Sequence, residues 1–413
     1  MAVHTIDEIY SPDARAMQHA RYALAVNEFE KLYKTLPTRF FSAPGRTEVG
    51  GNHTDHNHGR VMAAGVSLDV IAAVTPTDDG IIEVESAGFP VDRVDLSDLS
   101  VRKEEEGSSA ALIRGVAAGF KKNGHSIGGF KAYTTSNVLK GSGLSSSAAF
   151  EVLIGNILNG LYNDHSVSAV EIAQLSQYAE NVYFGKPSGL MDQMASSVGG
   201  FITIDFADPA KPVINEIDFD LEASGYKLCI VDTKGSHADL TPEYAAIPKE
   251  MKEVASYFAK SVLRDVSREE IVENIAPLRE KYGDRAVLRA LHFADENDRV
   301  LREADALRKG DLDRFFDEVK ASGRSSYMYL QNVFAPSDPA HQGLSMALWT
   351  ASELLGDRGA FRVHGGGFAG TIQAFVPAGM IDKFSSAMEK IFGERSCYVL
   401  SVRPFGGTEV KLG

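Results

Sequence analysis

Residues 141–149 read Gly-Ser-Gly-Leu-Ser-Ser-Ser-Ala-Ala and lie between a predicted strand, 130–135, and the most strongly patterned helix of the chain. Small residues let a backbone approach a phosphate group closely. The free amides at a helix start offer donors and the positive end of a dipole. The serine hydroxyls add further donors, or an oxygen ligand for Mg²⁺. A plain capping turn needs only one serine, so the pattern favours a phosphate-binding loop over a cap.

The helix after this loop is predicted to begin near Ala148. Its apolar residues step by three, one, three, one and three positions, which gives a single apolar stripe along one helix face. These residues are Phe150, Leu153, Ile154, Ile157, Leu158 and Leu161. The loop is not the common P-loop, because no Gly-Lys-Ser/Thr follows at the required spacing.

The rest of the chain mixes helices with hairpin-like strands, which predicts an α+β fold. Helices are predicted over 14–34 and 381–392, and through the charged region from Pro242 to Phe316, which Thr241 opens as a hydroxyl cap. Strands are predicted at 66–75, 81–85, 130–135, 201–206, 228–231, 371–376 and 397–402. The proline-rich break at 208–212 predicts a boundary between two lobes, 1–210 and 211–413.

Length and composition limit the function. At 413 residues the chain is too long for one ordinary core, and 44% hydrophobic with 24% charged residues indicates a globular protein. The net charge of −14, from 42 basic and 56 acidic residues, argues against a large nucleic-acid or anionic-membrane footprint. Two cysteines form no disulfide framework, and neither a signal peptide nor a membrane span is visible. A cytoplasmic protein is therefore predicted.

A second notable segment is 44–59, Pro-Gly-Arg-Thr-Glu-Val-Gly-Gly-Asn-His-Thr-Asp-His-Asn-His-Gly. It places many hydrogen-bonding side chains in a predicted loop bounded by glycines, which suits a polyhydroxylated ligand. Two alternatives are a solvated polar loop and a metal site built from His53, Asp55, His56 and His58. Zinc sites usually draw ligands from a helix or from two knuckles, and no second His/Cys cluster accompanies this one.

Two further segments carry candidate groups. Residues 364–371 read His-Gly-Gly-Gly-Phe-Ala-Gly-Thr, in which three adjacent glycines leave room for a ligand but also suit a tight hairpin. Residues 185–196 place Asp192 in a stretch of small and apolar residues after a Pro-Ser-Gly turn. From its surroundings alone, Asp192 is either a helix cap or a functional acid. Glu180, by itself, has the pattern of an ordinary surface residue.

Taken together, these segments resemble the galactokinase branch of the superfamily that also holds homoserine, mevalonate and phosphomevalonate kinases. The resemblance covers nearly the whole chain. Residues 43–55 look like the galactokinase sugar signature, 141–149 like the family's phosphate loop, and 365–370 like its third glycine motif. Three motifs in the family order are specific, although each alone is not. The resemblance implies two α+β lobes with the active site in the cleft between them.

The resemblance also implies an activity, the ATP-dependent phosphorylation of galactose at its anomeric C1 hydroxyl. Asp192 is then the base that takes the hydroxyl proton, and Arg46 the cation that keeps it ionised and offsets charge in the transition state. Ser147 and Glu180 hold Mg²⁺, with Ser146 as the alternative if the alignment slips by one. The ATP phosphates lie against Gly141, Ser142, Gly143, Leu144, Ser145, Ser146, Ser147 and Ala148. The sugar lies among Asn52, His53, Asp55, Gly189 and Tyr244.

The chain departs from the usual galactokinase pattern at several positions. Asn52 stands where glutamate is usual, in the region expected to read the C6 end of the sugar. Thr47-Glu48 replaces Val-Asn, and His364 replaces a common threonine. His56 stands in place of a tyrosine, and the Asn and paired arginines that usually follow Tyr244 are absent. None of these changes removes a catalytic group, but they leave more than one sugar as a candidate substrate.

Galactose remains the favoured substrate, because Asn52 still offers hydrogen bonds to a C6 hydroxyl. Galacturonate, arabinose and N-acetylgalactosamine are alternatives. A non-catalytic sugar sensor is a rival of another class, but such a protein is expected to lose the phosphate loop or the base, and both are intact here. The expected partners are the sugar and ATP, with no nucleic acid and no membrane, and the chain is expected to be a monomer or a weak oligomer.

Overall fold

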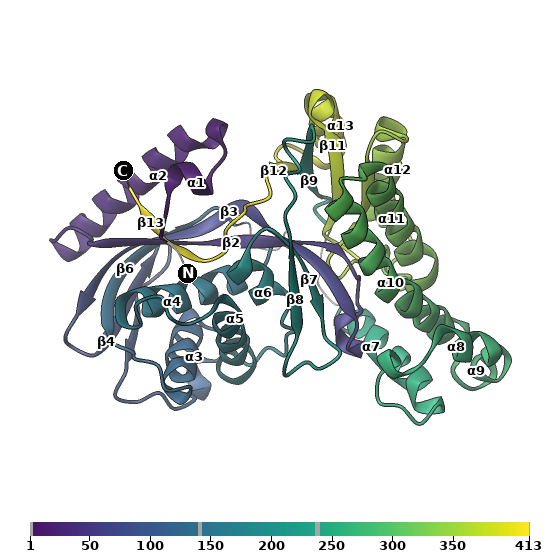
Figure 1. Ribbon diagram of the computed structural model, residues 1–413, viewed down its shortest axis with the longest axis horizontal. Helices are drawn as coiled ribbons and strands as arrows, with labels where there is room; N and C mark the ends of the chain where they lie inside the picture. Colours follow the sequence, from purple (N-terminus) through teal and green to yellow (C-terminus); the bar gives the residue numbers. More distant parts are fainter. Residues whose placement is uncertain (1–2, 139–142, 236–239, 413) are drawn as a thin grey trace.

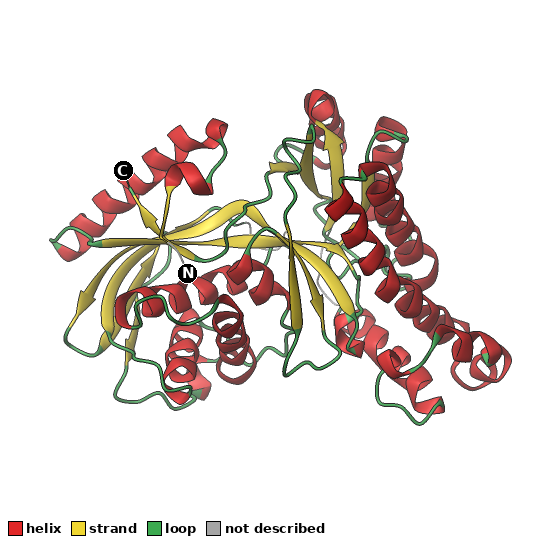
Figure 2. Ribbon diagram, in the orientation of Figure 1, coloured by secondary structure: helices red, strands yellow, loops and turns green. Residues whose placement is uncertain are grey.

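The computed structural model describes residues 3–138, 143–235 and 240–412. Within these residues the strands form two sheets, one of nine strands and one of four (Figures 1 and 2). Helices cover both faces of the large sheet and stand in a separate group beside the small one, which confirms the α+β prediction. No helix in the described part of the chain is long and apolar enough to cross a bilayer.

The large sheet is built around two long strands, β2 (Arg39–Gly50) and β3 (Arg60–Thr77). Its order is β1-β13-β2-β3-β6-β4-β5, and β7 joins β3 while β8 joins β7. The other strands are β1 (Val3–Thr5), β4 (Ile81–Ser86), β5 (Asp92–Asp95), β6 (Gly129–Ser136), β7 (Phe201–Asp205), β8 (Val213–Ile217) and β13 (Thr408–Lys411). Neighbours are antiparallel except β1 with β13 and β4 with β6.

Strand β2 corrects the prediction that residues 44–50 belong to a loop. The register between β2 and β3 shifts between Pro44 and Arg46, and again between Glu48 and Gly50. A proline has no N–H to donate, and a bulge accommodates that loss while it turns the next side chain. The two irregularities hid the strand's alternation in the sequence.

Helices lie on both faces of the large sheet (Figure 1). On one face α3 (Ser109–Lys122), α4 (Ser146–Tyr162), α5 (Ala169–Tyr178) and α6 (Met191–Val198) form a layer, and on the other face lies α2 (Pro12–Tyr33) after the short α1 (Ile6–Ile9). The apolar stripe predicted for α4 packs into the core, where Leu153, Ile154, Ile157 and Leu158 have no exposed surface. This layer brings α4 and α6 into contact with β2.

The second part of the chain forms the small sheet, in the order β10-β11-β9-β12. Its strands are β9 (Tyr226–Asp232), β10 (Ala360–His364), β11 (Thr371–Pro377) and β12 (Cys397–Leu400). Helices α10 (Asp284–Lys309), α11 (Leu312–Ser325), α12 (Gly343–Leu355) and α13 (Ile381–Phe392) lie beside it, and α7 (Thr241–Tyr257), α8 (Arg268–Glu273) and α9 (Ile275–Tyr282) extend the group. Helix α10 also contacts β2 and β3, which joins the two parts.

Two strands complicate a division of the chain at residue 210. Strand β8 and the C-terminal β13 both follow residue 210 in sequence but lie in the large sheet, which the N-terminal half of the chain mostly forms (Figure 1). The lobe boundaries 1–210 and 211–413 therefore remain a prediction. The hydroxyl cap predicted for α7 was wrong: the N-cap is Leu240, and Thr241 is the first helical residue.

Candidate active site

Arg46 and Asp192 form the centre of the site. Arg46 lies on β2 and donates from Nε to Oδ1 of Asp192 on α6, over 2.7 Å. A second guanidinium N–H of Arg46 bonds to the carbonyl of Gly143, and the Ser145 hydroxyl donates to the other carboxylate oxygen of Asp192. The site thus joins three segments that are far apart in sequence, namely the sugar signature, the phosphate loop and helix α6.

Asp192 does not cap the helix that carries it. The N-cap of α6 is Leu190, and no side chain caps that helix. Burial alone would raise the pKa of Asp192, but the Arg46 guanidinium, with the Ser145 hydroxyl, holds it below its ordinary value. The carboxylate is therefore ionised at neutral pH, and its side chain keeps 29% of its surface exposed to a ligand.

The described part of the phosphate loop leads directly into α4. Gly141 and Ser142 lie outside the described residues. Gly143 has φ 72° and Ser145 has φ 55°, both in the left-handed region, and α4 begins at Ser146. No side chain caps α4, because the Ser145 hydroxyl is turned to Asp192 instead. The start of α4, with Ser146, Ser147 and Ala148 in its first turn, thus lies beside Asp192, and the first N–H groups of a helix have no partner within the helix.

The two predicted metal-binding oxygens are neighbours. Ser147 Oγ lies 3.1 Å from Oε1 of Glu180, which is 2% exposed and sits in a π-helical segment, Ala179–Phe184. π-Helical turns are frequent at functional sites. Lys186 pairs with the same oxygen at 2.8 Å. A cationic group thus already occupies the position in which a metal ion would balance this carboxylate.

His53 and Asp55 lie in the segment that follows β2, residues 51–59, which is called the sugar loop below. His53 has its Nε2 3.0 Å from the carbonyl of Gly366, which makes Nε2 the donor and leaves Nδ1 as an acceptor. Burial lowers the pKa of His53 to about 4, so the ring is neutral. Asp55 accepts from the backbone N–H of His56 through Oδ1 and turns Oδ2 toward Gly189.

Gly189 leaves room for Asp55. A Cβ built on Gly189 would lie 2.6 Å from Asp55 Oδ2, which is too close for any real side chain. Gly189→Ala is therefore expected to displace the carboxylate and to raise the KM for the sugar about tenfold, with the KM for ATP unchanged. Gly379→Ala is the matched control, because no atom lies within 4 Å of the added carbon. Equal sugar KM values in the two variants would contradict this role of Gly189.

Tyr244 and Asn52 make their hydrogen bonds mainly within the protein. The Tyr244 hydroxyl donates to the carbonyl of Gly367 over 2.9 Å, and its ring meets Phe368 edge-on. Asn52 is completely buried, and its amide nitrogen donates to Glu48 Oε1 and to the Gly365 carbonyl at 2.9 and 2.8 Å. Its amide oxygen accepts from Ser326 and Asn332. The Asn52 side chain therefore links the sugar loop, residues 51–59, to the third glycine motif, and its amide is hydrogen-bonded to protein groups.

The zinc alternative has no support in the described part of the chain. No group of three or more His, Cys, Asp and Glu side chains lies close enough there to hold a metal ion. His53 and His56 have ring centres 6.2 Å apart, and His53 is engaged by the Gly366 carbonyl.

Lys186 and Arg362 escaped the sequence analysis, and His364 was noted there only as a departure from the family pattern. Lys186 is the only cation in 185–196 and pairs with Glu180. Arg362 and His364 alternate on β10 with apolar residues, and both are buried. A charged residue at a buried strand position was the available signal, because such a residue requires a partner. The partner of Arg362 is Glu48, at 2.8 Å.

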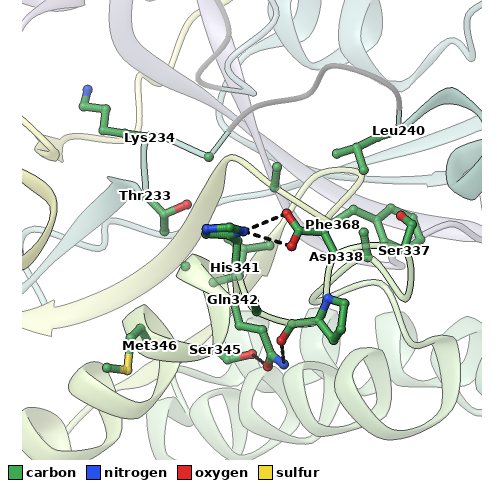
Figure 3. A pocket seen from close by; sticks show the side chains of 17 residues that line it. Thr233, Lys234, Leu240, Ser337, Asp338, His341, Gln342, Ser345, Met346 and Phe368 are labelled. Carbon is green, nitrogen blue, oxygen red and sulfur yellow. Dashed lines mark hydrogen bonds and ion pairs between the residues drawn. The ribbon is translucent and has the colours of Figure 1, made fainter.

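A hollow of about 1060 Å³ adjoins the third glycine motif (Figure 3). Thr233, Lys234, Phe368 and the turn before α12 line it, and the Asp338–His341 ion pair lies on one wall. Neither Arg46 nor Asp192 lines this hollow.

The fold and the site together define a kinase of the GHMP class. The sequence profile described as "GHMP kinases N terminal domain" matches residues 107–200, which contain the phosphate loop, Glu180 and Asp192. Mevalonate kinase from Methanococcus jannaschii has the same fold, with a TM-score of 0.62 at 14% identity over 88% of this chain and 98% of that one.

Closer relatives narrow the class. The "Galactokinase galactose-binding signature" matches residues 27–76. The galactokinase of Streptomyces coelicolor is 34% identical over 88% of this chain and 91% of its own length, and that of Actinobacillus pleuropneumoniae is 30% identical over 87% and 90%. The crystal structure of Lactococcus lactis galactokinase complexed with galactose matches with a TM-score of 0.79 at 26% identity, over 94% of this chain and 99% of that one. The chain belongs to the galactokinase family.

Proposed function

We propose that this protein transfers the γ-phosphoryl group of ATP to the anomeric C1 hydroxyl of galactose, giving galactose 1-phosphate and ADP. The observation that carries the proposal is the Arg46–Asp192 pair, which lies beside the phosphate loop in a member of the galactokinase family. In the reaction the C1 oxygen bonds to the γ-phosphorus while the bond to the β–γ bridging oxygen breaks. The hydroxyl proton passes to Asp192.

Asp192 is a weak base, because its pKa lies below the ordinary value. That suits phosphoryl transfer, whose loose transition state develops little charge on the attacking oxygen until late. The main role of Asp192 is then to orient the hydroxyl for in-line attack and to receive the proton as the bond forms. Arg46 fixes Asp192 and offsets negative charge on the transferring group, together with the N-terminal amides of α4.

Mg²⁺ is the expected metal, held by Ser147 and Glu180. Their adjacent oxygens suit a hard cation, and the Lys186 ion pair supports the assignment because it marks a position that requires positive charge. When bound, the ion would be held by Ser147 and Glu180 and would neutralise negative charge on the phosphates. Lys186 is 56% exposed and is free to swing away from Glu180 toward a phosphate.

Glu180→Gln is therefore expected to raise the concentration of Mg²⁺ at half-maximal activity about tenfold, because one charged ligand becomes neutral. The KM for the sugar is expected to stay unchanged. Direct Mg²⁺ binding in the presence of a non-hydrolysable ATP analogue gives a measurement that does not depend on turnover. The control is Glu171→Gln, since Glu171, on α5, pairs with His125 and with none of the proposed site residues. An unchanged Mg²⁺ requirement would remove Glu180 from the metal site.

The sugar is proposed to lie among His53, Asp55, Gly189 and Tyr244. The open acceptors, His53 Nδ1 and Asp55 Oδ2, require a substrate with hydroxyl donors at matching positions, as a hexose ring has. We assign Asn52 the role of positioning this loop, since its side chain is fully engaged by protein groups.

An ATP-consumption assay over galactose, galacturonate, arabinose, N-acetylgalactosamine, glucose and mevalonate tests the proposal. Fastest turnover on galactose, with the phosphate at C1 by ³¹P NMR, is the expected result. Faster turnover on another sugar would change the substrate and keep the kinase. If galactose bound but none of the six compounds was phosphorylated, the protein would be a non-catalytic sugar sensor and not a kinase.

The chain is further proposed to act as a monomer or weak oligomer in the cytoplasm, on the basis of its net charge of −14 and its two free cysteines. Light scattering at micromolar concentration and fractionation of cells test these two points.

A further inference from the structure

His364 lies where three separate segments of the chain meet. It ends β10 and is 2% exposed. Its Nδ1 lies 2.9 Å from Oγ1 of Thr371, and its Nε2 lies 3.1 Å from Oγ1 of Thr47 and 3.3 Å from the backbone nitrogen of Glu48. Both Thr47 and Glu48 directly follow Arg46 on β2. The ring thus links the third glycine motif to the strand that carries the catalytic arginine.

The hydrogen bonds fix the tautomer of this ring. The Glu48 backbone amide is only a donor, so Nε2 must be the acceptor and the ring proton must be on Nδ1. The Thr47 hydroxyl accepts from Gln373 Nε2 at 2.5 Å and so directs its own proton to Nε2 as well. Nδ1–H then donates to Thr371. Both ring nitrogens are therefore satisfied only in the neutral Nδ1–H form.

The surrounding charges favour the same neutral form. Burial lowers the pKa of His364 well below its usual value, and the nearby cations Arg46 on β2 and Arg362 on β10 lower it further. Asp192 on α6 acts in the opposite direction but is already paired with Arg46. A protonated His364 would lose its acceptor for the Glu48 amide and add a second cation beside Arg46.

The ring also supports the phosphate loop. A Cβ built on Gly143 would lie 3.2 Å from Nδ1 and 3.4 Å from Cε1 of His364, so the imidazole lies close beside this glycine and leaves little room for a side chain there. The carbonyl of the same glycine accepts from Arg46. Gly143 therefore lies close to His364 and is hydrogen-bonded to Arg46, two residues before Ser145, which bonds to Asp192.

Four departures from the usual galactokinase pattern form one hydrogen-bonded group. Thr47 and the Glu48 amide bond to His364, and the Glu48 carboxylate accepts from Asn52 at 2.9 Å. Changes that touch one another across more than 300 residues of sequence indicate a unit whose members fit together. This group contacts the two residues that follow Arg46 and lies next to Gly143, so it adjoins the proposed reacting groups.

We propose that His364 is a positioning residue for phosphoryl transfer, acting as a neutral junction that holds Arg46 and the phosphate loop in register with the third glycine motif. It touches no substrate and acts through Arg46 and Gly143. The inference rests on the proposed kinase function, and turnover is to be measured on whichever sugar of the panel the wild type phosphorylates best. A wrong sugar assignment therefore leaves the test intact.

Two variants of His364 separate this role from plain packing. The glutamine oxygen of His364→Gln can take the place of Nε2 and accept from Glu48 and Thr47, whereas the amide nitrogen of His364→Asn can replace only the Nδ1 donor. The expected result is a kcat within about threefold of wild type for His364→Gln. For His364→Asn we expect about a 100-fold lower kcat, with the KM for ATP and for the sugar changed less than about threefold. Equal kcat losses, or losses only in KM, would overturn the proposal.

Thr47→Val is the second test, since it removes the hydroxyl and keeps the shape. It is expected to lower kcat about tenfold, and the double variant Thr47→Val/His364→Asn is expected to be no slower than His364→Asn alone. A multiplied loss of about 1000-fold would mean that the two residues act independently, against the proposal. His125→Asn, at a half-buried histidine paired with Glu171, is the control and is expected to leave kcat unchanged.

The tautomer of His364 gives a test on the wild-type protein, which depends neither on enzyme turnover nor on the folding of a variant. In ¹⁵N NMR of the wild-type protein at pH 6, Nε2 of His364 is expected at the chemical shift of an unprotonated nitrogen and Nδ1 at that of a protonated one. A proton on Nε2, or on both nitrogens, would overturn the junction even if the enzyme proved active. The expected tautomer in a protein without kinase activity would instead overturn the proposed function.

Discussion

Asp192→Asn is expected to lower kcat about 1000-fold, while the affinity for ATP and the melting temperature stay nearly unchanged. An amide cannot take the hydroxyl proton, and it no longer carries the charge that Arg46 faces at 2.7 Å. The fold is spared because the amide oxygen still accepts from Arg46 and because Arg46 keeps its bond to the Gly143 carbonyl. Steady-state kinetics, ATP calorimetry and a thermal melt measure the three quantities.

The control for this variant is Asp205→Asn. Like Asp192, Asp205 is paired with arginine: it accepts from Arg60 and Arg264 at 2.8 and 2.9 Å. It lies on β7 and is not one of the proposed site residues. Its kcat is expected to remain that of wild type. If Asp192→Asn instead lost stability in proportion to activity, Asp192 would be structural.

The same carboxylate sets a pH dependence. Because the folded-state pKa of Asp192 is lowered, the group stays ionised down to a pH below the ordinary carboxyl range, and its share of stability is lost only as the pH falls through that lowered value. The acid limb of kcat that belongs to Asp192 is accordingly expected at a pH below the ordinary carboxyl range.

Arg362→Met is expected to lower the free energy of unfolding by about 3–5 kcal/mol, the usual effect of removing one partner of a buried ion pair. Arg362 is completely buried, and it donates to the Glu48 carboxylate at 2.8 Å and to the Val49 carbonyl at 2.7 Å. Methionine fills a similar volume but leaves Glu48, which is 5% exposed, without its cation. Chemical denaturation measures the loss.

The direction of its pH dependence follows from Glu48. Burial already raises the pKa of Glu48, and Arg362 is the strongest influence that lowers it. Without Arg362 the folded-state pKa rises further, so the destabilisation is complete above that pKa and fades as the pH falls toward the unfolded-state value. The stability gap between wild type and variant is thus expected to narrow from pH 8 to pH 5.

A second substitution tests the assignment of this loss to the ion pair. Glu48→Gln in the Arg362→Met background removes the stranded charge and is expected to recover part of the loss. Arg93→Met removes a largely exposed arginine, paired with Glu83 at 3.0 Å, and is expected to cost less than about 1 kcal/mol. A similar loss at both arginines would contradict the role given to burial.

Much of the architecture was predictable because its signals are local. The stripe on α4, the helices at 12–33 and 381–392, and strands β3, β4, β6, β7, β9, β11 and β12 follow from periodicities that a short window contains. The motifs likewise specified the class of chemistry, since a glycine- and serine-rich loop before a helix binds phosphate through its own backbone. Strand β2 was missed because its two register shifts break that local alternation.

Tertiary structure decided what each candidate side chain does. From its sequence Asp192 could be a cap or an acid; the structure excludes the cap and places the carboxylate beside Arg46 and Ser145. Asn52 was expected to face the sugar, yet its four amide hydrogen bonds go to residues between 4 and 313 positions away. Hydrogen bonds and ion pairs join groups that only the packing of the chain brings together, and no window of sequence records which groups those are. The sequence by itself determined the fold class and the phosphate chemistry; the packing of β2 against α4, α6 and β10 determined which residues form the site.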